Sequence, residues 1–198
     1  MDELTPALAQ KIALRDRLLT ARRRLSLLEV QEAAQAIAGH LLATDAVRRA
    51  ATVAAYVSVG TEPGTGPLLE ALAAAGRRVV LPCLLPDNDL DWAVHTGELR
   101  RAGRGLLEPT GPRLGREAVA TADIVLVPGL AVDGNGMRLG RGGGSYDRAL
   151  GRVPVGTVTC VLLHEGEVVD TVPAEPHDRP VTAAVTPSGI TLFASAPG

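Results

Sequence analysis

The hydrophobic and polar positions of the first part of this chain follow the period of an α-helix. Apolar residues recur every three or four positions, which places them on one helix face. This pattern predicts a helix over residues 7–24. Its apolar positions are Leu8, Ile12, Leu14, Leu18, Leu19 and Leu25. Ser26 and Glu29 then have the spacing of a capping box, so we expect a second helix to begin there and to end near Leu42.

Beyond residue 50, short apolar runs alternate with short helical segments. The predicted strands cover residues 51–59, 79–85, 90–94, 124–127, 155–163 and 181–185, and the predicted helices cover residues 67–75, 116–121 and 146–150. The run 90–94 alternates like a half-exposed strand. Strands that alternate with helices are typical of α/β proteins with a parallel sheet. We therefore expect one α/β domain over residues 1–198: a three-layer sandwich around a largely parallel sheet, with two N-terminal helices.

This topology also predicts where a ligand would bind. In open α/β sheets, ligands sit at the carboxyl ends of the strands. Three loops follow predicted strands there, over residues 58–65, 130–145 and 164–179. We expect these loops to form the walls of one cleft.

Composition narrows the class of protein. The 198 residues are 46% hydrophobic but only 2% aromatic, so the core must consist of Leu, Val and Ala. A net charge of -2 argues against a general nucleic-acid or membrane-surface binder. No apolar run reaches the roughly 18 residues of a membrane span. Residues 1–3 lack the layout of a signal peptide, and Cys83 and Cys160 lie in apolar runs, so we expect a cytoplasmic protein with buried, reduced thiols.

A glycine-rich loop is the most informative segment. It follows the run 124–127, holds Arg138 and Arg141 among its glycines, and leads into the helix predicted over residues 146–150. Glycine lets backbone amides approach an anion closely, and arginines add fork-shaped donors. The loop lacks the Gly-Lys-Ser/Thr of a P-loop and ends in Ser145 where a dinucleotide-binding fingerprint would have glycine or alanine. We interpret it as a phosphate site, with solvated loop arginines as the alternative.

Other residues have one structural and one functional interpretation each. Lys11 is the only lysine among many arginines, and is either a solvated helix residue or a functional cation. Asp147 follows the glycine loop, and either stabilises a helix N-terminus or binds Mg²⁺. Asp178 is a turn residue or a second carboxylate for the metal. Glu62 follows a strand and is either a solvated acid or a ligand-binding carboxylate. Trp92 either stacks on a planar ligand or fills the core.

Several of these residues fall in motifs that resemble a known family. Pro128-Gly129-Leu130-Ala131 and Arg138-Leu139-Gly140-x-Gly142-x-Gly144-x-Tyr146-Asp147 resemble the signature of the 5-formyltetrahydrofolate cyclo-ligases. Lys11-x-x-x-Arg15 is similar to the nucleotide-contacting pair of that family, and Tyr56-x-Ser58-x-x-x-Glu62-x-x-Thr65 to its folate-side segment. Leu81-Pro82, Glu108-Pro109 and His177-Asp178 follow in the expected order. The departures are Ser145, Pro63-Gly64 and Val132, which bear on the shape of the folate pocket.

The resemblance implies a reaction and a set of site residues. ATP and 5-formyltetrahydrofolate would give 5,10-methenyltetrahydrofolate, ADP and phosphate. The implied ATP-binding residues are Lys11, Arg15, Arg138, Leu139, Gly140, Arg141, Gly142, Gly143, Gly144, Ser145 and Tyr146. The implied folate-binding residues are Val57, Glu62 and Trp92, and the implied Mg²⁺ ligands are Asp147 and Asp178. The expected partners are these two substrates, with no nucleic acid and no membrane, and the expected state is a monomer.

Two other functions stay open from the sequence alone. A sugar-phosphate isomerase or CoA transferase of related architecture would also have a phosphate-binding loop, but it would need neither ATP nor Lys11. A non-catalytic relative that binds folate, nucleotide or RNA would tend to lose Lys11, Glu62 or Asp147. All three residues are present, which argues against that alternative.

Overall fold

The computed structural model describes residues 5–194 of the chain, so the expectation for residues 1–3 lies outside the described residues. The helices are α1 (Pro6–Arg22), α2 (Leu27–Ala43), α3 (Asp45–Arg49), α4 (Gly66–Ala74) and α5 (Ser145–Leu150), with 3₁₀ turns η1 (Gly103–Gly105) and η2 (Arg116–Thr121). The strands are β1 (Thr52–Ala54), β2 (Arg78–Leu84), β3 (Leu90–Val94), β4 (Leu99–Arg101), β5 (Leu107–Pro109), β6 (Ile124–Pro128), β7 (Ala131–Val132), β8 (Arg138–Leu139), β9 (Val158–Leu162), β10 (Ala183–Thr186) and β11 (Gly189–Leu192).

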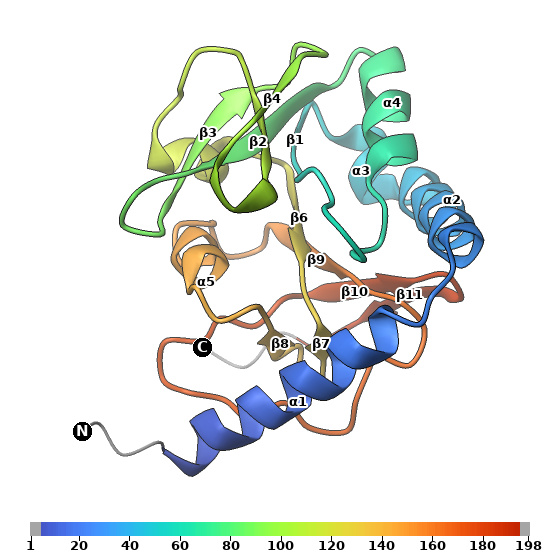
Figure 1. Cartoon of the computed structure of the whole chain (residues 1–198). Helices are drawn as coiled ribbons and strands as arrows, with labels where there is room; N and C mark the ends of the chain where they lie inside the picture. Colours follow the sequence, from blue (N-terminus) through green and yellow to red (C-terminus); the bar gives the residue numbers. More distant parts are fainter. Residues whose placement is uncertain (1–4, 195–198) are drawn as a thin grey trace.

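Within the described range, seven strands form one sheet in the order β11-β10-β9-β6-β1-β2-β3 (Figure 1). Its five central strands run parallel, and the edge strands β3 and β11 are antiparallel to their neighbours. The register places Val53 of β1 beside Val79 of β2 and Ile124 of β6. The prediction of a largely parallel sheet is therefore confirmed.

Helical elements cover both faces of this sheet. Val53 and Ile124 belong to a buried cluster with side chains of α2, α3 and α4. The neighbouring residues Ala54 and Val125 point the other way, into a cluster with η2 and α5. Because both faces are covered, the central strands are continuous apolar runs rather than alternating ones. This arrangement is the predicted three-layer sandwich.

The two predicted N-terminal helices are both present. The capping box of α2 is formed as expected: the Glu29 N–H donates to Ser26 Oγ (3.2 Å) and the Ser26 N–H donates to Glu29 Oε2 (2.7 Å). Helix α1 lies outside the layers, along the β7–β8 hairpin that follows β6 (Figure 1). Its Leu18 packs there against Leu130 and Leu139. This contact holds α1 beside the carboxyl edge of the sheet.

Three expectations about strands and helices were wrong in extent or character. The strand predicted over residues 51–59 ends at Ala54, and the chain then leaves the sheet to form a loop. The run 90–94 is a strand but not half-exposed, because η2 covers it. Residues 116–121 form a 3₁₀ turn rather than an α-helix. The short elements α3, β4, β5, β7, β8 and β11 were not predicted.

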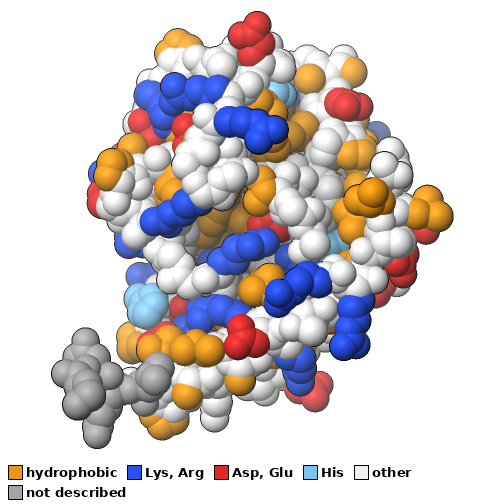
Figure 2. All heavy atoms as spheres, viewed as in Figure 1, with side chains coloured by type: hydrophobic (Ala, Val, Ile, Leu, Met, Phe, Trp, Pro, Cys, Tyr) orange, Lys and Arg blue, Asp and Glu red, His pale blue; other side chains and the backbone are white. Residues whose placement is uncertain are grey.

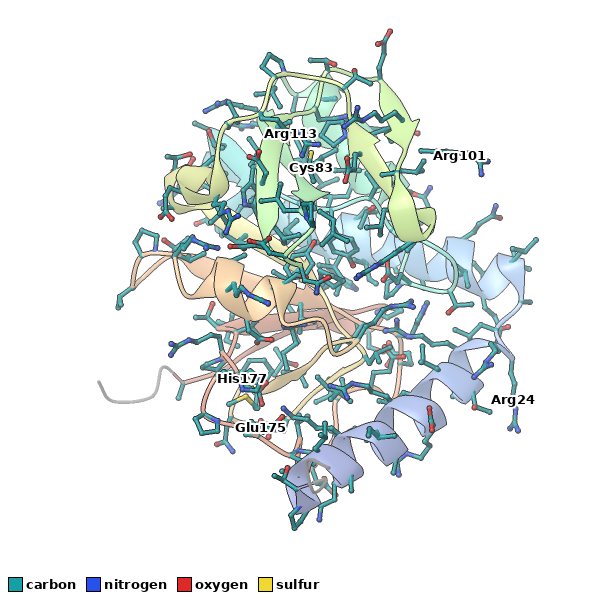
Figure 3. All side chains as sticks on the ribbon, turned by 60° about the vertical axis from the view of Figure 1, so that its left-hand side comes forward. Arg24, Cys83, Arg101, Arg113, Glu175 and His177 are labelled. Atoms are coloured by element: carbon teal, nitrogen blue, oxygen red, sulfur yellow. The ribbon has the colours of Figure 1, made fainter. Side chains whose placement is uncertain are left out.

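Both cysteines are free and buried, as expected. Cys160 lies in the cluster beneath α2, and burial raises its pKa to about 12. Cys83 lies on β2 in the interior (Figure 3). Neither thiol has the exposed, electropositive surroundings of a reactive cysteine. No helix among residues 5–194 combines the length and the apolar character needed to cross a membrane.

Candidate active site

The glycine-rich loop connects β8 to α5 at the carboxyl edge of the sheet. Gly142 (φ +101°) and Gly144 (φ +69°) have positive φ, and Gly144 is the residue before the first turn of α5. A side chain is strained in this conformation, which explains glycine at both positions. Ser145 is the first residue of α5. The loop therefore turns sharply into a helix, as the sequence predicted.

A cavity of about 680 Å³ opens beside this loop. Its walls are Gly142, Gly143, Gly144, Asp147, Arg148, Gly151, Arg152, His177 and Arg179. A volume of this size is typical of a small-molecule site. Three arginines against one aspartate make it suited to a polyanion. Figure 2 shows Lys and Arg side chains gathered across the middle of this face of the molecule.

Lys11 is buried, only 3% exposed, so the interpretation as a solvated helix residue is wrong. Its Nζ lies 2.7 Å from Glu175 Oε2 and 2.5 Å from Asp178 Oδ2. Burial would lower the pKa of Lys11, but the hydrogen bonds to the two carboxylates outweigh this and raise it. Lys11 is therefore a charged group beside the cavity. Figure 3 shows the loop that carries Glu175 and His177 facing α1.

Arg15 lies one turn further along the same face of α1 and reaches the glycine loop. Its Nε donates to the carbonyl of Gly140 (2.9 Å). A Cβ at Gly142 would lie 3.5 Å from the Arg15 guanidinium carbon, so the arginine packs closely against the loop at this glycine. Lys11 and Arg15 therefore both contact segments of the candidate site, as their spacing suggested.

Arg138 is buried, 5% exposed, and fixes the loop from inside. Its Nη1 donates to the Pro128 carbonyl (3.1 Å) and its Nη2 donates to Asp147 Oδ1 (3.3 Å). The guanidinium lies 5.9 Å from the ring centroid of Tyr146. Burial lowers the pKa of Arg138, and the charge of Asp147 offsets part of that effect. The geometry thus gives Arg138 a bracing role, while contact with a phosphate stays a prediction.

Glu62 is buried, 7% exposed, in the loop that follows β1. Its Oε2 accepts a hydrogen bond from the Val59 N–H (2.9 Å), and Arg141 Nε lies 3.4 Å from its Oε1. Burial raises the pKa of Glu62, and these two partners offset only part of the effect. The exposed Arg141 thus points from the glycine loop toward Glu62, so this arginine joins the two predicted halves of the cleft.

Other predicted residues occupy the rim or the interior. Tyr146 is half-buried, and burial together with the charge of Glu62 raises its pKa. The side chain of Leu139 is buried beneath α1. Its backbone carbonyl accepts a hydrogen bond from the Leu130 N–H (2.8 Å). Val57 is half-buried against the cluster beneath α2. Gly64, a departure from the family pattern, lies so close to α2 that a Cβ there would be 2.9 Å from the Ala34 Cβ.

The expectation that Trp92 binds substrate was wrong. Its side chain is 0% exposed and lies in the cluster between β3, η2 and α5. No face of the indole is open to a planar ligand. Trp92 fills the core, which was the alternative interpretation.

The two predicted metal ligands lie on neighbouring segments but have different partners. Asp147 Oδ1 accepts from the N–H of Arg179, the residue after Asp178 (3.1 Å). Asp178 Oδ2 accepts from Lys11 and from the Glu175 N–H (2.7 Å). Burial alone would raise the pKa of Asp178, but Lys11 outweighs it and the pKa is lowered. Asp178 is therefore an ionised carboxylate beside the cavity.

This donor set fits one kind of metal site. Among residues 5–194, no three His, Cys, Asp or Glu side chains gather in a way that could surround an ion. Mg²⁺ is commonly held by one or two carboxylates together with phosphates and water. The arrangement therefore suits Mg²⁺ that is bound mainly by a nucleotide and anchored by Asp147.

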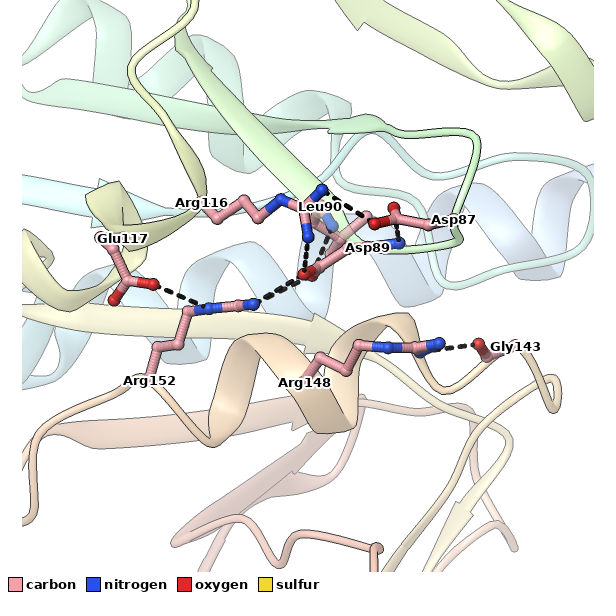
Figure 4. A network of polar contacts seen from close by, with 8 residues as sticks. All are labelled: Asp87, Asp89, Leu90, Arg116, Glu117, Gly143, Arg148 and Arg152. Carbon is pink, nitrogen blue, oxygen red and sulfur yellow. Dashed lines mark hydrogen bonds and ion pairs between the residues drawn. The ribbon is translucent and has the colours of Figure 1, made fainter.

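Sequence reasoning missed four residues of the cavity wall, Arg148, Arg152, His177 and Arg179. Arg148 Nη1 donates to the Gly143 carbonyl (3.2 Å) (Figure 4). Arg148 and Arg152 are four residues apart, and this spacing after the glycine loop was a visible signal. Arg179 follows the predicted Asp178, but no spacing in the sequence connects it with Asp147.

The fold and the site define a class: an α/β enzyme with an arginine-bearing glycine loop at the carboxyl edge of its sheet. The chain belongs to the 5-formyltetrahydrofolate cyclo-ligase family, whose model matches residues 7–187. The expected family is thereby confirmed.

Individual relatives agree with this assignment. The chain is 40% identical over 183 residues to a 5-formyltetrahydrofolate cyclo-ligase of Mycolicibacterium smegmatis, covering 89% of this chain and 93% of that protein. It is 35% identical over 179 residues to the enzyme of that name from Escherichia coli strain K12, covering 85% and 96%. The structure of Aquifex aeolicus 5,10-methenyltetrahydrofolate synthetase superimposes with a TM-score of 0.80 at 26% identity, covering 95% of each chain. A Mycoplasma pneumoniae synthetase shares the fold at 22% identity, with a TM-score of 0.72 and coverage of 89% and 98%.

Proposed function

We propose that this protein uses ATP to convert 5-formyltetrahydrofolate into 5,10-methenyltetrahydrofolate, with release of ADP and phosphate. The observation that carries the proposal is the contact between Arg141 of the glycine loop and the buried Glu62 (3.4 Å). This contact supports a site for an anion and a site for a hydrogen-bonding ring system that would lie side by side. A phosphoryl group bound at the loop would thus lie near a substrate bound at Glu62.

The chemistry requires positioning and charge stabilisation rather than a covalent nucleophile. The formyl oxygen is a poor leaving group until the γ-phosphoryl group of ATP is transferred to it and ADP departs. N10 of the folate then attacks the activated carbon and loses its proton. This attack closes the ring, and the carbon–oxygen bond then breaks so that phosphate leaves and the methenyl group forms.

Basic residues of this chain would bind the phosphates. Arg148, Arg152 and Arg179 line the cavity, and Lys11 holds the loop 175–178 beside it. Arg141 would stabilise the group in transfer. Arg138 and Arg15 would hold the glycine loop in shape through their bonds to Pro128, Asp147 and Gly140. The amide groups of the loop would add further donors.

Glu62 would bind the folate near the reacting nitrogens. Its raised pKa makes it a good acceptor for a ring N–H, and Arg141 keeps it close to the phosphoryl group. Asp147 would hold the magnesium of a bound Mg·ATP. Asp178 would support the same site indirectly, through its ion pair with Lys11 or through a bound water. When bound, that ion neutralises phosphate charge. Because every residue named lies in one chain, the proposal requires no second subunit.

The test is a direct assay on the purified chain. The protein is mixed with 5-formyltetrahydrofolate, MgCl₂ and ATP, and the absorbance of methenyltetrahydrofolate is followed. Omission of ATP, its replacement by a non-hydrolysable analogue, and addition of EDTA serve as controls. We expect product only with ATP, in equal amount to ADP. ATP-independent product, or none at all, would contradict the proposal.

The Mg·ATP part of the proposal has its own test. Asp147→Asn should raise the Mg²⁺ concentration needed for half-maximal rate, while the far-UV circular dichroism spectrum stays as in the wild type. An unchanged requirement for Mg²⁺ would show that Asp147 stabilises only the start of α5 and the neighbouring loop.

A further inference from the structure

The loop that carries Glu62 is held from outside by a histidine. His164, two residues after β9 ends at Leu162, places its Nε2 3.0 Å from the carbonyl oxygen of Thr61. Thr61 is the residue immediately before Glu62. The His164 side chain is only 6% exposed, and the contact joins positions 103 residues apart in the chain.

His164 is itself fixed by a buried ion pair. Its backbone N–H donates to Glu167 Oε2 (2.8 Å), and Glu167 binds Arg22 of α1 through both oxygens (2.7 and 2.8 Å). Arg22 Nη2 also donates to the carbonyl of Gly129 (2.6 Å), just after β6. Arg22 and Glu167 are 1% and 4% exposed. The histidine thus connects the Glu62 loop with α1 and with the end of β6.

The chemistry of the ring fits this contact. Burial lowers the pKa of His164, and the hydrogen bond to Thr61 offsets only part of that effect. A neutral ring with its proton on Nε2 donates to the Thr61 carbonyl. The loop already has local hydrogen bonds between Ser58 and Thr65, at 2.9 and 3.0 Å. Those bonds close the loop on itself, whereas the bond from His164 fixes it relative to the sheet.

We propose that His164 is a positioning residue for Glu62. It holds the Thr61–Glu62 peptide so that the carboxylate meets the folate substrate and Arg141 at once. This inference rests on the proposed function, in which Glu62 binds folate. Displacement of a binding group by about 1 Å can cost on the order of a hundredfold in rate. Because Glu62 would bind the folate, loss of the His164–Thr61 contact should impair the use of 5-formyltetrahydrofolate and spare the use of ATP.

Two substitutions separate the hydrogen bond from the volume of the ring. His164→Leu removes the donor, whereas His164→Gln places an amide N–H near the position of Nε2. We expect His164→Leu to lower kcat/KM for 5-formyltetrahydrofolate about tenfold and to leave KM for ATP within twofold. His164→Gln should recover most of the loss. If His164→Leu does not fold, His164→Gln is compared with His164→Asn, whose shorter amide cannot reach Thr61.

His40 supplies a matched control. Its Nε2 contacts the Pro187 carbonyl at 2.9 Å, which is the same kind of bond, but it joins α2 to the β10–β11 turn rather than to the site. His40→Leu should lower the melting temperature and leave both KM values unchanged. Equal effects of His40→Leu and His164→Leu on folate kinetics would overturn the proposal.

A double-mutant cycle tests whether His164 acts through Glu62. Once Glu62→Gln has removed the carboxylate, the further change His164→Leu should cost less than twofold. Additive losses would assign His164 a purely structural role and overturn the proposal.

Hydrogen exchange provides a readout that does not depend on turnover. Backbone amides of residues 59–65 should exchange faster in His164→Leu than in the wild type or in His164→Gln. A wild-type protein without cyclo-ligase activity would refute the proposed function, whereas unchanged exchange in these amides would refute the anchoring itself.

Discussion

Two buried carboxylates of this molecule have opposite surroundings. Asp89, before β3, is 2% exposed and is bound by Arg152 through both oxygens (2.9 and 2.6 Å) and by Arg116 (2.9 Å). The same arginines reach Asp87 and Glu117, which completes a network (Figure 4). Glu62 is also buried, at 7% exposed, but the cation that contacts it, Arg141, is exposed and lies 3.4 Å away.

The pKa values follow from this difference. The hydrogen bonds of Arg152 outweigh burial and lower the pKa of Asp89 to about 2. At Glu62 burial outweighs the partners and the pKa is raised. A buried carboxylate whose charge is balanced by hydrogen-bonded arginines stabilises the fold. A buried carboxylate with fewer such partners can accept hydrogen bonds from a ligand. The comparison assigns Asp89 to the architecture and Glu62 to the function.

Lys11 tests whether a matched charge always means an architectural role. It is paired as fully as Asp89, yet its partners lie beside the cavity. We expect Lys11→Met to lower kcat/KM for ATP about 1000-fold, or about 4 kcal/mol, because it removes a cation near the phosphates and breaks the buried ion pairs with Glu175 and Asp178. The measurement is steady-state kinetics with ATP varied. Arg17→Met, an exposed arginine of the same helix, is the control and should retain wild-type kinetics.

Glu62→Gln should produce the next largest effect. Loss of the charge should lower kcat/KM for 5-formyltetrahydrofolate about 100-fold, or about 3 kcal/mol, and leave KM for ATP within twofold. A raised folded-state pKa means that ionisation of Glu62 opposes folding above its ordinary pKa. The substitution should therefore leave the melting temperature unchanged or raise it. If ATP use fails and folate kinetics stay normal, Glu62 has been assigned to the wrong half of the cleft.

The sequence pattern predicted the layers well because burial on both faces of a sheet leaves long apolar runs. The hydropathy pattern also caused the errors in the predicted strand ends and in the exposure predicted for Trp92. Residues 55–57 continue the apolar run of β1 and are wholly or partly buried. The Ala55 N–H still donates to the Val80 carbonyl (3.0 Å), but the chain then leaves the sheet and begins the Glu62 loop. Trp92 follows a half-exposed pattern, yet η2 folds over it from 24 positions away. Hydropathy reports burial and does not show which element provides it.

The candidate site was predictable where chemistry is local in sequence. The glycine loop and Glu62 were found from their place after a strand, and Lys11 from its rarity. The contacts of His164 with Thr61 and of Arg152 with Asp89 join residues far apart in the chain, so no spacing reveals them. His164 has no partner at a recognisable spacing in the sequence, because its partners are a carbonyl and an ion pair that folding alone brings near.

Asp89→Asn is the converse of Glu62→Gln. Removal of one partner from a buried network is costly, but Arg116 and Arg152 retain contact with solvent, so we expect a loss of between about 2 and 3 kcal/mol in the free energy of unfolding. Denaturant unfolding measures it. KM for 5-formyltetrahydrofolate should stay as in the wild type. A substitution that impaired folate use and spared stability would reverse the two assignments.

The pH dependence of stability should show the same contrast. The pKa of Asp89 is depressed from an ordinary value near 3.9 to about 2, so its contribution is present above pH 4 and is lost as the pH falls toward 2. The expected loss from this group is about 2 kcal/mol. Unfolding curves between pH 5 and pH 2 measure it, with Asp89→Asn lacking this part of the decline. Parallel curves for the two proteins would mean that other carboxylates cause the acid sensitivity.

Arg141 should show the smallest effect and the sharpest separation of stability from function. Its side chain is 52% exposed, and ion pairs of exposed groups contribute little to stability, so Arg141→Gln should change the free energy of unfolding by less than about 0.5 kcal/mol. It should nevertheless lower kcat about fivefold, or about 1 kcal/mol, because a charge between Glu62 and the transferring phosphoryl group is lost. Because Glu62 would then lack the cation that contacts its carboxylate, its pKa should rise further, and the acid limb of the kcat/KM profile for folate should move to higher pH. An unchanged acid limb with a lowered kcat would show that Arg141 serves the phosphates alone, and that Glu62 is poised by burial without its help.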